Sequence, residues 1–133
     1  MITTGALHHI TLTVTDVARS EQFYAGLLGF HKVREFGLRA ILSNGSVRLV
    51  LTPPPDPARA IENDRFDENR VGLDHLSLSV GTRADLDRAL RLFEERGVPH
   101  GEVKDLGPDS GLYVLAFRDP DNIQLELSAP YAG

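Results

Sequence analysis

Polar and apolar residues alternate along two short segments in different halves of the chain. Residues 7–14 read LHHITLTV and residues 73–80 read LDHLSLSV, so that four of eight positions are identical and three are conservative. His9 corresponds to His75 in this alignment, 66 positions later. Alternation with a period of two predicts a half-buried strand in each segment, and self-similarity at about half the chain length predicts two related modules.

A helical pattern follows each of these strands. Asp16 is a suitable cap for a helix over residues 17–28, and Thr82 or Arg83 begins a second helix that Gly97 ends. Further strand patterns are expected at residues 38–42, 47–52, 112–117 and 123–128, with weakly marked strands near Val33 and Val103. Each half therefore has the order β-α-β-β-β, which predicts an α+β fold.

A proline-rich segment separates the halves. Four of the five residues at positions 53–57 are proline, which excludes a helix or a central strand there. We expect a single domain over residues 1–133, with module 1 at about 5–54, a linker at about 55–70 and module 2 at about 71–130. The linker is either a solvated connector or a loop over a site, because long loops in small domains are often functional.

Composition narrows the functional class. The 133 residues carry a net charge of -5, and Lys and Arg form no cluster, which argues against nucleic-acid binding. The chain has no cysteine, so a disulfide scaffold, a thiolate metal site and a cysteine nucleophile are excluded. No apolar run approaches the roughly 20 residues that span a bilayer, and no targeting segment is evident. We expect a cytoplasmic protein with no membrane partner.

Strand alternation places polar side chains on common faces. These sets are His9 with Thr11 and Thr13, His75 with Ser77 and Ser79, and Gln124 with Glu126 and Ser128. Each polar face could simply contact water, as in many antiparallel sheets. Two repeat-related histidines and one carboxylate are also the ligand set of a facial metal triad, which leaves coordination positions open for substrate.

The same residues resemble a known family. The resemblance rests on residues 9–16 (HITLTVTD), 23–30 (FYAGLLGF), 72–75 (GLDH) and 119–127 (DPDNIQLEL). Together these motifs resemble the vicinal oxygen chelate superfamily, which includes glyoxalases, extradiol dioxygenases, fosfomycin-modifying thiol transferases and bleomycin-sequestering proteins. The resemblance implies two βαβββ modules that form a partly closed mixed-sheet barrel around a metal-binding cavity. It implies one divalent ion, Fe, Mn, Ni, Co or Zn, held by His9, His75 and Glu126.

The resemblance leaves several activities open. It implies a metal-dependent enzyme with glyoxalase-like or dioxygenase-like chemistry on a small oxygen-chelating substrate. A four-ligand glyoxalase has a further carboxylate at the position that matches Val50 here, so this chain departs from that pattern. Three ligands suit the dioxygenase and fosfomycin transferase branches better. The alternatives are a protein that sequesters a drug without catalysis, as bleomycin-resistance proteins do, and a fosfomycin-type thiol transferase.

Other residues are candidates for supporting roles. Thr11 matches a threonine that assists fosfomycin transferases, and Tyr113 is a candidate acid or hydrogen-bond donor. The candidates for substrate binding are Arg48, Ser77 and Gln124. Alternation predicts that His8 and Asp74 point away from the faces of His9 and His75. Relatives of this length are commonly homodimers, so a homodimer is expected, with modules paired either within one chain or across two chains.

Overall fold

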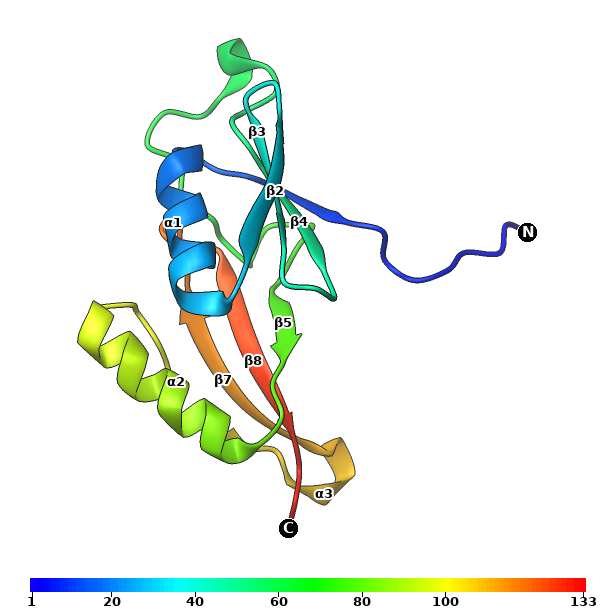
Figure 1. Ribbon diagram of the computed structural model, residues 1–133, viewed down its shortest axis with the longest axis vertical. Helices are drawn as coiled ribbons and strands as arrows, with labels where there is room; N and C mark the ends of the chain where they lie inside the picture. Colours follow the sequence, from blue (N-terminus) through cyan, green and yellow to red (C-terminus); the bar gives the residue numbers. More distant parts are fainter. The chain divides into compact units, whose positions relative to one another are not determined.

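The computed structural model describes residues 1–133 and divides them into two compact units, residues 1–64 and 65–133. Figure 1 shows the elements of both units. Unit 1 contains β1 (Ile10–Thr13), α1 (Val17–Leu28), β2 (His31–Phe36), β3 (Arg39–Ser43), β4 (Arg48–Thr52) and the 3-10 turn η1 (Pro57–Arg59). Unit 2 contains β5 (Leu76–Ser79), α2 (Arg83–Arg96), β6 (Lys104–Asp105), α3 (Gly107–Ser110), β7 (Leu112–Arg118) and β8 (Gln124–Pro130).

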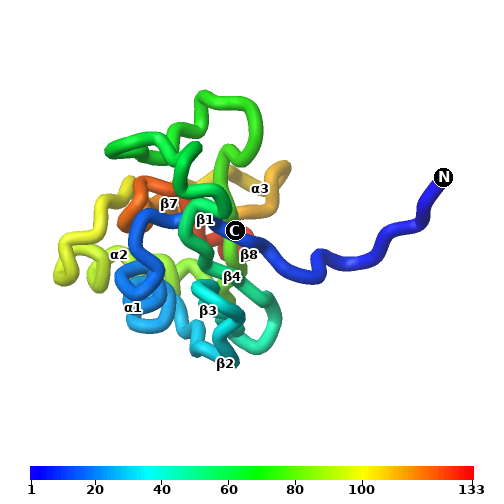
Figure 2. The backbone as a smooth tube through the Cα atoms, turned by 90° about the horizontal axis from the view of Figure 1, so that it is seen from above, coloured from blue at the N-terminus to red at the C-terminus, as the bar shows by residue number.

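Unit 1 is a four-stranded mixed sheet with α1 packed on it. The strand order is β1-β4-β3-β2, with β1 parallel to β4 and the other neighbours antiparallel. Asp16 caps α1 by accepting a hydrogen bond from the Arg19 amide at 3.0 Å, and Gly29 ends the helix in the left-handed conformation. The residues before β1 are exposed and extend away from this sheet (Figures 1 and 2).

Unit 2 repeats the topology of unit 1. Its strand order is β5-β8-β7-β6, and β5 is parallel to β8 as β1 is to β4. In unit 1 Thr11 lies opposite Val50, and in unit 2 Ser77 lies opposite Glu126. The predicted α+β fold of tandem βαβββ modules is therefore confirmed, and the strand register makes Val50 the counterpart of Glu126. The two four-stranded sheets are separate and are not closed into a barrel by hydrogen bonds.

The helix-covered face of the second sheet forms the core of unit 2. The α2 helix lies along β7 and β8 (Figure 1), and its Phe93 ring stacks on Phe117 of β7 at 4.5 Å between centroids. Alternate residues of β8, including Leu125 and Leu127, are buried, whereas Gln124 and Glu126 between them are only half-buried. The opposite face of the sheet therefore carries the polar side chains.

The linker contains a short helical turn and is hydrogen-bonded to unit 2 in its second half. A 3-10 turn begins at Pro57 although no helix was expected, because proline is tolerated at the first position of a helical turn, where its missing N–H is not needed. The second half of the linker is bonded to unit 2: the Phe66 amide donates to the Asp121 carbonyl at 2.9 Å, and the Asn122 side chain donates to the Phe66 carbonyl at 3.0 Å.

Neither α1 nor α2 combines the length and apolarity that a membrane span requires.

Candidate functional site

A histidine and a glutamate meet on the polar face of unit 2. Glu126 lies in the middle of β8, between Ser77 of β5 and Ala116 of β7, and His75 immediately precedes β5. The Nε2 atom of His75 lies 3.9 Å from Oε1 of Glu126. Both side chains are accessible, with 40% of the His75 side chain and 21% of the Glu126 side chain exposed. The parallel pairing of β5 with β8 thus brings together two of the three predicted metal ligands.

Asp74 orients the imidazole of His75. Its Oδ1 atom lies 2.7 Å from Nδ1 of His75. The expectation that Asp74 points away from His75 was wrong, because β5 begins only at Leu76 and strand alternation does not extend to the preceding residues. A carboxylate only accepts hydrogen bonds, so Nδ1 of His75 is the donor in this pair and Nε2 is the nitrogen that faces Glu126.

Serine hydroxyls support Glu126. Ser128 donates a hydrogen bond to Oε1 of Glu126 at 3.2 Å, and the hydroxyls of Ser77 and Ser128 are bonded to each other across β5 and β8. Ser77 was predicted to bind substrate, and the structure places it on the same face as Glu126. No hydrogen bond reaches Oε2 of Glu126, so one oxygen of this carboxylate remains open.

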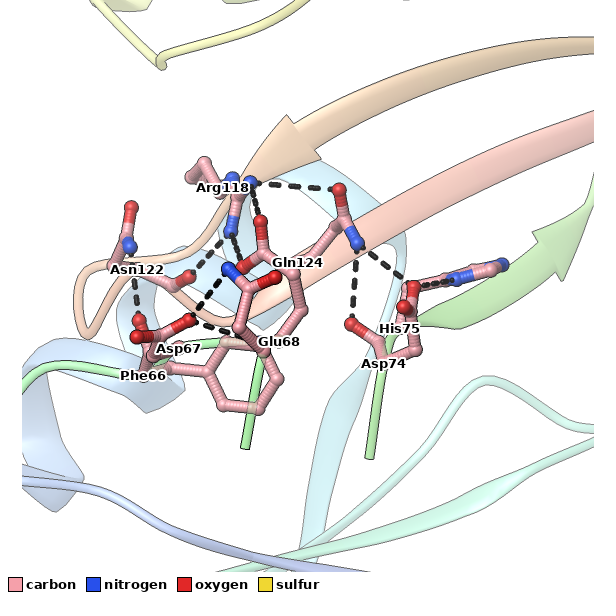
Figure 3. A network of polar contacts seen from close by, with 9 residues as sticks. Phe66, Asp67, Glu68, Asp74, His75, Arg118, Asn122 and Gln124 are labelled. Carbon is pink, nitrogen blue, oxygen red and sulfur yellow. Dashed lines mark hydrogen bonds and ion pairs between the residues drawn. The ribbon is translucent and has the colours of Figure 1, made fainter. Parts of the chain in front are cut away.

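Gln124 links Asp74 to the ion pair between Arg118 and Glu68 (Figure 3). Its Nε2 donates to the carbonyl oxygen of Asp74 at 3.1 Å and to Oδ1 of Asp74 at 3.0 Å, while its Oε1 accepts from Nη2 of Arg118 at 3.4 Å. Arg118 in turn donates to both carboxylate oxygens of Glu68 at 2.9 Å each. The Gln124 amide, predicted to bind substrate, is therefore used within the protein.

The bidentate bond from Arg118 lowers the pKa of Glu68 to about 2, well below its ordinary value of 4.5. A carboxyl group whose pKa is lower in the folded state contributes stability above its unfolded pKa, and this contribution is lost as the pH falls from about 4.5 toward about 2. We therefore expect the unfolding free energy of Glu68→Gln to fall less steeply than that of the wild type as the pH decreases over this range. Urea titrations at several acidic pH values measure it, with Glu94→Gln on the exposed surface of α2 as the control for one lost charge. Equal slopes for wild type and Glu68→Gln would contradict this linkage.

The unit 1 candidates lie around β1 and β4. His9 is exposed and precedes β1, and its Nδ1 lies 2.8 Å from Nδ1 of His8. His8 was expected to point away from His9, but both precede the strand, so alternation does not separate them. Thr11 is exposed on β1, and Arg48 is exposed at the start of β4. The structure contains no cluster of three or more His, Cys, Asp or Glu side chains arranged to hold a metal ion.

Tyr113 lies on the other face of the second sheet. It is 4% exposed, and Arg83 of α2 lies over its ring at 5.1 Å. Its hydroxyl accepts a hydrogen bond from the Ala132 amide at 3.3 Å. Because α2 covers this face and Glu126 occupies the opposite one, the predicted role of Tyr113 as an acid or hydrogen-bond donor toward substrate does not fit its placement.

Sequence reasoning did not identify Arg118 or Glu68. The predicted strand at 112–117 ended before Arg118, and a turn over residues 119–122 would set Arg118 opposite Ile123, whereas the observed partner is Gln124. Glu68 carried no signal either, because it lies in an irregular segment 50 residues before Arg118.

The chain is similar to one protein family over most of its length. The model of the Glyoxalase/Bleomycin resistance protein/Dioxygenase superfamily matches residues 6–127. The uncharacterized protein YwkD of Bacillus subtilis (strain 168) is 31% identical over 129 residues, which cover 92% of this chain and 94% of YwkD. The crystal structure of a glyoxylase/bleomycin resistance protein/dioxygenase domain from Frankia sp. EAN1pec has 30% identity and a TM-score of 0.81, covering 98% of this chain and 96% of that chain.

A structure of lactoylglutathione lyase from Agrobacterium tumefaciens is also similar, with 25% identity and a TM-score of 0.72 over 95% of this chain and 94% of that chain. The family model covers far more than half of the sequence, and the Frankia domain has the same fold over nearly the whole chain. This protein therefore belongs to the glyoxalase/bleomycin resistance protein/dioxygenase superfamily, the vicinal oxygen chelate proteins.

Proposed function

We propose that this protein is a divalent-metal-dependent enzyme that acts on a small substrate with neighbouring oxygen atoms. The observation that carries the proposal is the pairing of His75 Nε2 with Glu126 Oε1 at 3.9 Å, with Nδ1 of the same imidazole bonded to Asp74. Metal-bound histidines characteristically donate their second ring N–H to a carboxylate or carbonyl, which orients the ring and raises its basicity. The arrangement around His75 has this form.

The donor atoms fit a divalent transition metal. Nitrogen and oxygen ligands bind such ions at about 2.0–2.2 Å, so adjacent ligand atoms lie about 3 Å apart, and a small rotation of the His75 and Glu126 side chains would bring their atoms to this separation. An imidazole and a carboxylate suit Fe, Mn, Co, Ni and Zn alike. The accessible side chains of His75 and Glu126 leave room for the remaining coordination positions.

We propose His9 as the third ligand, on the basis of its repeat correspondence to His75. Like His75, it is the residue immediately before the first strand of its module. We also propose that the protein is a homodimer, with His9 supplied either by the same chain or by the second copy. Light scattering that finds only a 14.6 kDa species at micromolar concentration would contradict the dimer.

The bound ion would act as a Lewis acid toward a chelating substrate. The chain itself supplies the proton chemistry: Ser128 occupies Oε1 of Glu126, and the open Oε2 can accept a proton from substrate. The exposed guanidinium of Arg48 and hydroxyl of Thr11 are proposed to bind substrate oxygens. Because Val50 stands at the counterpart of Glu126, dioxygenase-like or three-ligand glyoxalase-like chemistry is favoured over the four-ligand lyase.

The test is elemental analysis of untagged protein purified without chelator. We expect about one equivalent of Fe, Mn, Ni, Co or Zn per chain, lost in the Glu126→Ala variant and retained in the control Glu102→Ala, which removes an exposed carboxylate. The identity of the metal then directs the choice of substrates to assay. Metal-free protein that cannot be reconstituted would overturn the proposal and favour drug sequestration, which ligand-induced fluorescence changes without turnover would reveal.

A further inference from the structure

We infer that Gln124 and Arg118 are positioning residues that hold His75 in the tautomer and orientation required of a metal ligand, acting through Asp74. The metal-binding consequence rests on the proposed function, whereas the orientation of the imidazole does not. Arg118 and Gln124 lie on the facing ends of β7 and β8, and their side-chain hydrogen bonds go to other partners than His75. Their effect must therefore pass along the chain of hydrogen bonds in Figure 3.

The direction of each hydrogen bond is set by the one before it. Arg118 has only donors, so the amide oxygen of Gln124 must face it and the amide nitrogen must face Asp74. That nitrogen donates to both the carbonyl oxygen and the side-chain Oδ1 of Asp74, at 3.1 and 3.0 Å. Oδ1 of Asp74 then accepts from Nδ1 of His75. Reversing the Gln124 amide would break its bonds to both Arg118 and Asp74.

Asp74 needs this support because its side chain is 68% exposed. An exposed carboxylate exchanges its partners with water and samples several rotamers. The two bonds from Gln124 hold the backbone carbonyl and the carboxylate of Asp74 together. His75 consequently meets a fixed acceptor at Nδ1, and its Nε2 is directed toward Glu126.

The network also secures the segment that carries Asp74 and His75. Glu68, in the same segment, accepts two bonds from Arg118, whose Nη1 also donates to the Asn122 carbonyl at 3.2 Å. The Arg118 and Glu68 side chains are only 25% and 27% exposed, so water competes less here than at Asp74. A bidentate arginine–carboxylate pair is among the stronger polar contacts in proteins. The ion pair is therefore the anchor and Gln124 is the link to the metal ligand.

The test reads the histidine tautomer in metal-free protein. Full-length protein labelled with ¹⁵N-histidine is examined by long-range ¹H–¹⁵N correlation near pH 8, where an ordinary imidazole is neutral, and His75 is assigned from the His75→Ala spectrum. We expect the Nδ1–H tautomer in the wild type and a mixture with the Nε2–H tautomer in Gln124→Met. Arg118→Met should give a smaller shift in the same direction. Gln22→Met, on the exposed surface of α1, is the matched control.

Metal affinity is the second readout. Titration with Co²⁺ is expected to show about 10- to 100-fold weaker binding for Gln124→Met than for wild type, the range usual for outer-shell partners. An unchanged urea midpoint in this variant distinguishes positioning from loss of fold. An Nδ1–H tautomer that persists in Gln124→Met would overturn the inference. A tautomer that responds in a protein that binds no Co²⁺ would support the inference and overturn the proposed function instead.

Discussion

Replacing His75 by alanine is expected to weaken Co²⁺ binding by about 100-fold or more, beyond the range usual for outer-shell changes, because it removes a direct ligand. The side chain is 40% exposed and lies outside the core, so the fold should be retained. Calorimetric or absorption titration with Co²⁺ measures the effect. His31→Ala on β2, which removes another exposed histidine, is the control and should bind as wild type does. Wild-type affinity in His75→Ala would exclude this residue as a ligand.

The same measurement on His9→Ala tests the third ligand, and a comparable loss is expected. Mixing the two variants then distinguishes the two ways of completing a site. If His9 of one copy serves the His75 and Glu126 of another, a mixed dimer contains one intact site and binding is partly restored. If each chain completes its own site, every site in the mixture lacks one histidine and no binding returns.

Phe93→Ala is expected to lower the unfolding free energy by about 3–5 kcal/mol, the usual cost of deleting a large buried aromatic side chain. Phe93 is 1% exposed and stacks on Phe117, so its removal leaves a cavity between α2 and β7. Because total stabilities are commonly about 5–15 kcal/mol, a loss of this size is a large fraction of the whole. Denaturant titration followed by circular dichroism measures it.

Phe36→Ala is the matched control, because this phenylalanine is 63% exposed on the edge strand β2. Its removal should change the unfolding free energy by about 0.5 kcal/mol or less. Equal losses in the two variants would show that the packing of α2 on β7 is not a principal source of stability. If a folded Phe93→Ala protein lost Co²⁺ binding, the packing of α2 would also be shown to support β7, the strand that pairs with β8 beside Glu126.

The helices and most strands followed from local signals. Asp16 and Gly29 marked the ends of α1, and Thr82 and Gly97 marked those of α2, because capping bonds and left-handed glycines act within a few residues. The short strand β6 lacked such signals, and the one-turn helix α3 had only Pro108 and the left-handed Gly111 in a segment too short to indicate a helix. Both depend on pairing or packing with β7, which is a tertiary contribution.

Alternation was reliable inside the strands and failed at their ends. It correctly placed Glu126, Ser77 and Gln124 on one face, because side chains in a strand point to opposite sides in turn. It was wrong for Asp74 and His8, which precede β5 and β1 and have irregular backbone. These are the positions where hydrogen bonding, rather than periodicity, decides the direction of a side chain.

The sequence by itself determined the repeat, the α+β order of elements, and the polar face of each strand that carries a candidate ligand. These features depend on periodicity and spacing, which can be read along the chain. Only the tertiary structure decided that Tyr113 faces α2, and that Gln124 bonds to Asp74 while Arg118 bonds to Glu68. These two bonds each join residues 50 positions apart, so only folding brings their partners together.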